Sequence, residues 1–214
     1  MSTTVRKPEN SGSNFDPIPQ GMHHAICYSV VDLGLQKISS PKYGEKIKPR
    51  ILLTFEVPDE RISYEKDGEQ LEGPRVIGKQ YTASLHENAI LRQDLESWRG
   101  KKFTDAELNG FDMSKLIGVN ALINVQHNTS NEKTYANIAT INPLAKGMET
   151  KAAENPHVHY EIEMQYSFPE SMPEWIVDKI KNSVQFTFED DKNLNEQADS
   201  HVEEQDDDNS DLPF

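Results

Sequence analysis

Basic and aromatic side chains recur together along the sequence, in a combination suited to holding a nucleic-acid strand. Lysine and arginine neutralise phosphates, while exposed aromatic rings stack on bases, at about 1–3 kcal/mol per stacked base. The densest stretch, from Lys37 to Arg50, holds five cations against the single acid Glu45. The candidate binding residues are Lys37, Lys42, Tyr43, Lys46, Lys48, Arg50, Arg75, Lys79, Tyr81, Arg99, Lys101, Lys102, Lys133 and Tyr135.

Several of these positions also have a plain structural interpretation. Tyr81 shares a strand face with Ala83 and fits a core better than a stacking site, because residues two apart in a strand point the same way. Trp98 lies at helical spacing and is also expected in a core. Tyr43 has no apolar neighbours and is expected to be exposed, whereas Tyr135 fits either environment. The lysine-rich stretch is also compatible with an ordinary solvated turn.

Catalytic and metal-binding chemistry finds little support in the sequence. The pairs His23-His24 and His157-x-His159 have no cysteine or acidic partner at ligand spacing. Cys27 is the only cysteine, which excludes an intrachain disulfide, and it is expected to be a small buried hydrophobe. No phosphate-binding glycine loop, nucleophile elbow or nuclease carboxylate pair is present. We therefore predict a protein that is not an enzyme, with no catalytic residue, no cofactor and no metal.

The elements that must position the candidate residues follow from hydrophobic periodicity. Alternation of apolar and polar residues predicts strands over 23–35, 48–57, 77–85, 119–126 and 134–141. Helical spacing over 88–98, followed by Gly100, predicts a helix between the third and fourth strands. A capping box from Thr104 to Glu107 adds a short helical turn. On this interpretation, the cations between Lys37 and Arg50 occupy the loop between the first two strands.

The remaining segments are less regular. Pro58 is expected to end the second strand, ahead of a charged loop with a small hairpin. The aromatic-rich stretch 159–168 is expected as an extra strand or as a segment that lies on the sheet. A capping box and Pro173 open a short helix near 172–182, with Trp175 expected to pack against the barrel.

The order strand, strand, strand, helix, strand, strand is the order of an OB-type barrel. That five-stranded Greek-key barrel presents strands 2 and 3 and the neighbouring loops to oligonucleotides or oligosaccharides. The expected fold is therefore mainly β, with a helix between strands 3 and 4, a short C-terminal helix and disordered termini. A different small antiparallel barrel or a sandwich would give the same order and stays open.

The net charge of −14 is distributed unevenly. Residues 187–214 hold eleven acidic residues and one lysine, a net charge of −10, which leaves −4 for residues 1–186. Between Gly21 and Thr150, sixteen basic residues nearly balance seventeen acidic ones. A neutral folded part still permits a basic face. The acidic stretch cannot form a core and repels itself, so it is expected to be an extended tail.

Apolar groups at the end of that tail require a partner, because no core can form around them. Here the sequence resembles bacterial and phage single-stranded DNA-binding proteins, whose acidic tails end in an aliphatic residue, proline and phenylalanine. In that family the tip docks on genome-maintenance enzymes. The partner-binding residues that the resemblance implies are Asp206, Asp207, Asp208, Asp211, Leu212, Pro213 and Phe214. An ordinary solubilising tail is the alternative interpretation.

The body of the chain is also similar to phage-encoded single-stranded DNA-binding proteins. The similarity runs from about Asp16 to Gly147 and is carried by the phrases at 53–58, 91–100 and 133–137. It implies DNA as the ligand, since stacking and phosphate contacts do not themselves select the sugar. It also implies a place in DNA replication, recombination or repair, in the cytoplasm of a bacterial host if the chain is phage-encoded.

The resulting prediction is a protein that coats single-stranded DNA with little sequence preference and recruits replication or recombination proteins through its tip. Its expected parts are a disordered arm (1–20), an OB-fold single-stranded DNA-binding domain (21–146), an extension (147–186) and a disordered acidic tail (187–214). No secretory or membrane segment is expected, so the location is cytoplasmic. The alternatives are an acidic mimic of DNA and an OB-domain accessory subunit of a nuclease or replication enzyme. Assembly into a homo-oligomer stays open.

Overall fold

The fold is built on a single antiparallel sheet. A computed structural model of the chain describes residues 16–40, 44–66, 68–130, 133–162 and 167–186. Its strands are β1 (Gly21–Ser40), β2 (Gly44–Lys66), β3 (Glu69–Thr82), β4 (Asn120–Ser130), β5 (Lys133–Asn142) and β6 (Val158–Tyr160). Its helices are α1 (Ile90–Arg99), α2 (Asp105–Leu108), the 3-10 helix η1 (Met113–Leu116) and α3 (Glu174–Lys181).

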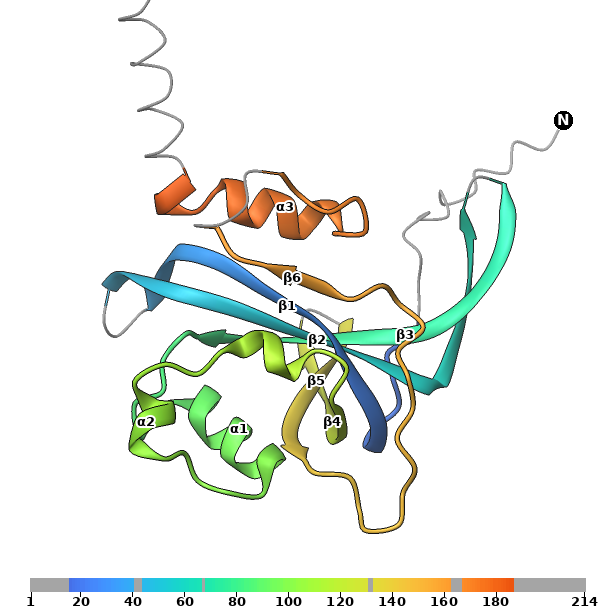
Figure 1. The fold of residues 1–214 in the computed structure, drawn as a ribbon. Coiled ribbons are helices and arrows are strands. Elements are labelled where there is room, and N and C mark those ends of the chain that lie inside the picture. Colours follow the sequence, from blue (N-terminus) through green and yellow to red (C-terminus); the bar gives the residue numbers. More distant parts are fainter. Residues whose placement is uncertain (1–15, 41–43, 67, 131–132, 163–166, 187–214) are drawn as a thin grey trace, which may run out of the picture.

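The strands follow the order β3-β2-β1-β4-β5, and the sheet curls into a half-barrel (Figure 1). α1 contacts both β3 and β5, the two ends of this order, so the helix lies across the open side of the curl. β6 is off the path and pairs in parallel with β1 at Ser29–Val31. The chain is therefore mainly β with a few helices, as the sequence predicts.

Apolar residues on both faces of the sheet build two cores. Ile51, Leu53 and Phe55 of β2 point into the curl, where they meet residues of α1, β4 and β5. Leu52 points the opposite way, into a second cluster that includes Ile176 and residues of β6. Sheets covered on both faces need apolar side chains at consecutive positions. The run from Ile51 to Phe55 meets that requirement.

The C-terminal extension supplies the cover of the outer face. Figure 1 shows α3 lying over the sheet beside β6, which is itself paired with β1. Ile176 and Ile180 are 3% and 0% exposed, and each buried side chain contributes about 1.5–3 kcal/mol. Gly34, with φ of 70°, lies where the extension passes closest; a Cβ there would be 2.5 Å from Ile162 Cδ1. Glycine therefore fits this bulge in β1, and a larger residue does not.

Two expectations about the strands are wrong. Residues 37–50 are not a loop, because β1 continues to Ser40 and β2 starts at Gly44, with Lys37 paired to Ile47. Pro58 does not end β2 either. A register shift between Val57 and Arg61 takes the proline out of the ladder, so its missing N–H costs no sheet hydrogen bond.

The helical expectations are confirmed with small shifts of boundary. α1 ends at Gly100 in the left-handed conformation, and the Thr104 to Glu107 capping box is present at α2. Trp98 is 4% exposed, its Nε1 donates to the Asn120 carbonyl at 2.9 Å, and its ring lies 5.4 Å from Phe55. The indole is a core residue, as its helical spacing predicts.

Burial favours the neutral forms of two further groups, the thiol of Cys27 and the hydroxyl of Tyr28. Cys27 is fully buried, as expected, and burial raises the pKa of its thiol to about 12. Burial, with the nearby carboxylate of Glu56, raises the pKa of Tyr28 to about 12. Neither group has the lowered pKa that an activated nucleophile requires.

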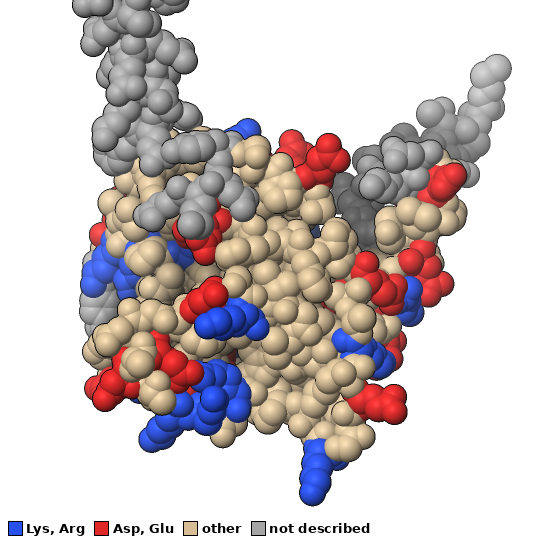
Figure 2. All heavy atoms as spheres, viewed as in Figure 1, with Lys and Arg blue, Asp and Glu red and all other residues tan. Residues whose placement is uncertain are grey.

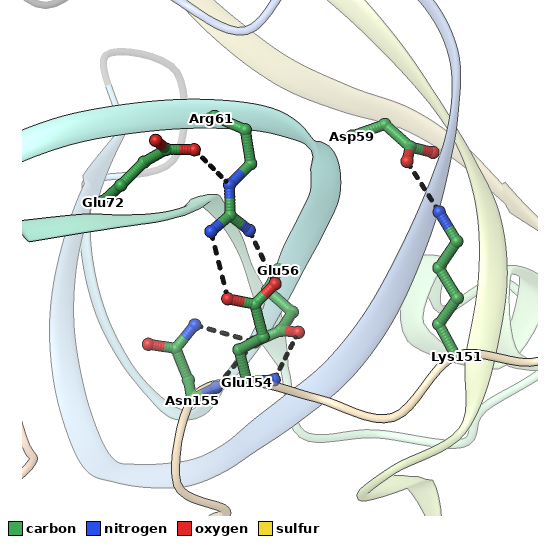
Figure 3. Close-up of polar contacts among 7 residues, drawn as sticks. All are labelled: Glu56, Asp59, Arg61, Glu72, Lys151, Glu154 and Asn155. Carbon is green, nitrogen blue, oxygen red and sulfur yellow. Dashed lines mark hydrogen bonds and ion pairs between the residues drawn. The ribbon is translucent and has the colours of Figure 1, made fainter.

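A polar clasp fixes the start of the extension to β2. Glu56, which is 0% exposed, accepts hydrogen bonds from the Glu154 N–H at 2.8 Å and from the Asn155 N–H and Nδ2 at 2.9 and 2.7 Å (Figure 3). Arg61 binds the Glu154 carboxylate through two nitrogens, at 2.6 and 3.2 Å. Lys151 adds an ion pair of 2.6 Å to Asp59. These contacts hold the chain where it crosses toward β6 and α3.

Within the described ranges, no helix is long and apolar enough to cross a membrane. The same ranges contain no group of three or more His, Cys, Asp or Glu side chains arranged to hold a metal.

Candidate nucleic-acid interface

Cations gather at the end of β3, around a pocket of about 410 Å³ that we call the basic pocket. Its walls come from β2, β3 and the segment that leads into α1. Lys48 and Arg50 share the strand face of Leu52, which packs in the outer core, and therefore point to the outer face. The residues that line it are Lys48, Arg50, Lys79, Gln80, Tyr81, Thr82, Ser84, His86, Asn88, Ala89, Ile90 and Leu91.

A fourth cation reaches the same region from α3. Lys179 Nζ donates to Gln80 Oε1 at 3.0 Å, and the Lys179 carbonyl accepts from Gln36 Nε2 at 2.9 Å. Burial, and then the charge of Arg50, lower the pKa of the Lys179 amine, and burial lowers the pKa of Arg50. Like charges held together in partial burial favour an anion between them.

The cations of the basic pocket differ in how far they are already neutralised. Among the described residues, Lys48, Arg50 and Lys179 make no ion pair, and Arg50 has only a long contact of 3.4 Å to Thr82. Lys79 is different, because its amine lies 2.7 Å from Asp94. Three cations are therefore available to a ligand, and Lys79 contributes less than the sequence predicts.

Tyr81 is not a stacking residue. Its side chain is 3% exposed and lies in the inner core, with its hydroxyl donating to Asp94 at 2.8 Å. Burial and the Asp94 carboxylate raise the pKa of this hydroxyl, so it stays a donor. The sequence prediction that placed Tyr81 among the binding residues is corrected here, in favour of its core interpretation.

A second pocket, of about 480 Å³, opens between β3 and β5 and brings Arg75 and Tyr135 together. Tyr135 is 50% exposed, and Lys133 lies two residues before it on the same strand face. The exposed side chain of Val76 lines the same opening. Arg75 is partly committed, because its guanidinium donates to the backbone carbonyls of residues 16 and 61. Tyr135 is thus the exposed ring that the sequence left undecided.

A third pocket lies between the sheet and α3 and contains Trp175, which the sequence predicts to pack against the barrel. Trp175 is 54% exposed, whereas its neighbour Ile176 is buried. Ile176 packs in the outer core, whereas the expectation that Trp175 packs against the barrel is wrong. This aromatic pocket holds about 80 Å³ and is lined by Tyr28, Ser29, Thr54, Val76, Val158, Ser171, Met172, Pro173, Trp175 and Ile176.

The three pockets follow one strand. Val76 is shared by the aromatic pocket and the β3–β5 opening, and the basic pocket begins at Lys79. Residues 75–82 of β3 therefore carry exposed rings toward one end and cations toward the other. We call this strip, with the side chains that border it, the β3 edge.

Other predicted residues lie apart from the β3 edge or are already engaged. Arg99 is paired with Glu107 and stacks over Phe103 at 4.4 Å, in an apolar pocket at the far end of α1. Lys101 and Lys102 are exposed beside it. Lys37 faces the opposite side of the β1–β2 hairpin from Lys48, since it pairs with Ile47.

Three further positions and the tail complete the account of the predicted residues. Lys46 shares the face of Lys48 on the hairpin, because strand residues two apart point the same way. Lys42 and Tyr43 fall outside the described residues, as do the tail positions 206–214.

Figure 2 shows this division of charge on one face of the molecule. Lysine and arginine side chains gather over the end of the β1–β2 hairpin below α3, and again near α1 and α2, where acidic side chains lie beside them. The charge near α1 and α2 is therefore locally balanced, while the hairpin end is mainly basic.

Comparison of the chain with known protein families and with curated proteins gives no match.

Proposed function

We propose that the half-barrel is an OB-type barrel and that it binds single-stranded DNA along the β3 edge, with little sequence preference and without catalysis. The strand order and the position of α1 between β3 and β4 agree with that fold. The approach of Lys79 Nζ to the Ala139 carbonyl, at 3.5 Å, supports a barrel nearly closed between β3 and β5.

The observation that carries this proposal is the set of cations at the basic pocket. Lys48 and Arg50 come from β2 and Lys179 from α3, yet they lie around one pocket, and none has an acidic partner among the described residues. Phosphates would supply that partner. Exposed rings at Tyr135 and Trp175 lie farther along the β3 edge, which favours unpaired bases over a duplex whose bases are already stacked.

The full-length chain is expected to bind oligo(dT) at least tenfold more tightly than a duplex of the same length. Fluorescence anisotropy with labelled strands measures both affinities. If the three free cations each contact a phosphate, the logarithm of the binding constant falls with the logarithm of salt concentration with a slope of about −2. Oligo(rU) in the same assay tests the choice of DNA over RNA.

Equal or tighter binding of the duplex would end this proposal. Failure to bind any of these strands at low salt would do the same, and would favour the acidic-mimic alternative.

We also propose that the acidic residues at 206–211 compete with DNA for the basic pocket and that the segment 206–214 recruits replication or recombination proteins. The eleven acidic residues beyond residue 186 are the support for the first part. A 28-residue segment that behaves as a random coil spans roughly 30 Å, enough to reach across a small barrel. DNA would then release the segment for partners.

Changing Asp206, Asp207 and Asp208 together to asparagine in the full chain is expected to tighten oligo(dT) binding about three- to tenfold at low salt. Three competing charges are removed, and the gain should vanish at high salt, where exposed charges are screened. Anisotropy at two salt concentrations measures it. Changing Glu65, Glu69 and Glu149 to glutamine removes as many charges from the folded surface. An equal gain in that control would contradict a specific role of the tail.

A further inference from the structure

The aromatic pocket calls for a ligand different from that of the basic pocket. No charged side chain lines it. Trp175 presents more than half of its surface to solvent at the rim, next to Val76, which is 49% exposed. A flat, uncharged ring is the kind of group that such a surface binds, because stacking needs contact area and no counter-charge.

Trp175 is held in place by the helix that carries it. Ile176 and Ile180 anchor α3 in the outer core, and Lys179 is tied to Gln80 and Gln36. An exposed indole on a fixed helix loses little freedom when a ligand covers it, so binding has a low entropic cost. The packing and hydrogen bonds of α3 therefore fix the position of Trp175 beside the sheet.

Trp175 and Lys179 lie beside β3 at two separate positions, Val76 and Gln80. Trp175 and Lys179 are four residues apart in α3 and lie on one face of the helix. Along the helix axis these two residues are about 6 Å apart, but their neighbours on β3, Val76 and Gln80, are about 13 Å apart along the strand. That distance exceeds one nucleotide step of about 3.4 Å along a stacked strand. A strand that crosses both pockets would place different nucleotides in each.

One polar group in the lining of the aromatic pocket, the hydroxyl of Thr54, lacks a hydrogen-bond partner among the described residues. Thr54 as a whole is 8% exposed. Gly78 has no side chain that would cover this part of the sheet. A Cβ at that position would lie 3.8 Å from the Thr54 hydroxyl and 3.0 Å from Leu52 Cδ1. The hydroxyl oxygen is itself buried, so a ring in this pocket would meet the apolar surface around it and not the hydroxyl.

We propose that Trp175 is a stacking platform for a base of the bound single strand, supplied by the C-terminal extension and not by the barrel. The inference rests on the proposed function. The extension is then part of the binding surface: α3 contributes the indole for a base and Lys179 for a phosphate, while β2 and β3 provide the opposite wall.

Intrinsic fluorescence gives a direct test, because the chain has two tryptophans and Trp98 is buried. Oligo(dT) is expected to quench the emission of the full-length protein, and Trp175→Phe is expected to abolish most of that quenching. Trp175→Ala is expected to weaken oligo(dT) binding about 5- to 100-fold by anisotropy, whereas Trp175→Phe keeps a ring and should stay within about threefold.

Met148→Ala is the matched control, since Met148 is an exposed apolar residue outside the three pockets of the β3 edge. It should leave affinity unchanged. Unaltered thermal unfolding of each variant excludes a folding defect. Normal oligo(dT) affinity in Trp175→Ala, with no quenching in the unaltered chain, would overturn the stacking role alone. No oligo(dT) binding by the unaltered chain would instead overturn the proposed function.

Discussion

Replacing Lys48 and Arg50 together by glutamate is expected to weaken oligo(dT) binding about a hundredfold at moderate salt. Each charge-assisted hydrogen bond to a phosphate contributes about 1.5–3 kcal/mol, and the loss of two corresponds to at least two orders of magnitude. Both side chains line the basic pocket, and neither has an acidic partner in the described part of the chain. The salt slope should also fall by about 1.4, because two phosphate contacts are lost.

Lys101→Glu together with Lys102→Glu is the matched control. Both double variants change the net charge from −14 to −18, so general repulsion of DNA is the same in each. Lys101 and Lys102 are exposed at the end of α1, apart from the β3 edge. We expect less than a fivefold loss for this pair. Equal losses in the two variants would show that overall charge, and not the basic pocket, governs binding.

The salt dependence separates local contacts from long-range attraction in the same experiment. A lost contact lowers the slope, whereas a change in net charge acting at a distance is screened beyond about 10 Å at 0.1 M salt. A hundredfold loss with an unchanged slope would therefore place the strand elsewhere on the molecule.

Much of the fold was predictable because the inner core imposes regular spacing on the sequence. Alternation along β2, β4 and β5 places apolar residues inside the curl, and Leu91, Leu95 and Trp98 form the buried stripe of α1. The same logic identified Trp98 as core. The ends of strands were less predictable: β1 and β2 continue as a hairpin whose exposed residues, such as Lys46 and Lys48, leave no burial pattern.

The outer core was predicted only in outline: the segment 159–168 was expected on the sheet and the helix near 172–182 against the barrel, but not the residues of β1 and β2 that they contact. Its contacts join β1 and β2 to an extension more than one hundred residues later in the sequence. The spacing of apolar residues within one strand or helix does not indicate which distant segment it contacts. A signal was nonetheless present in Val30-Val31 and in Ile51-Leu52-Leu53. Consecutive apolar residues in a strand indicate burial on both faces.

The candidate site was predicted in part for the same reason. Lys48 and Arg50 were found from local charge density. Lys179 and Trp175 were not, because only the docking of α3 brings them to β3. Conversely, Lys79 and Arg99 looked available in the sequence but are paired with Asp94 and Glu107 in the fold.

The docking of the extension depends on Glu56, and Glu56→Gln is expected to lower the free energy of unfolding by about 3 kcal/mol. One carboxylate oxygen accepts from the Glu154 N–H and the other accepts two bonds from Asn155. An amide in either orientation turns an NH2 group toward at least one of these donors. A buried donor without an acceptor costs about 1–3 kcal/mol, and charge-assisted bonds are lost as well.

Urea denaturation followed by tryptophan emission measures this change, and Glu72→Gln is the matched control within the same cluster. Glu72 also binds Arg61, but its side chain is 61% exposed, so solvent screens this ion pair and its loss should change stability far less than Glu56→Gln. A loss below about 1 kcal/mol in Glu56→Gln would contradict the clasp as a stabilising device. A loss of 3 kcal/mol is a large part of the 5–15 kcal/mol that stabilises most domains. If it is accompanied by weaker oligo(dT) binding, the clasp also positions Trp175 and Lys179 on the β3 edge, because the chain it fixes continues through β6 to α3.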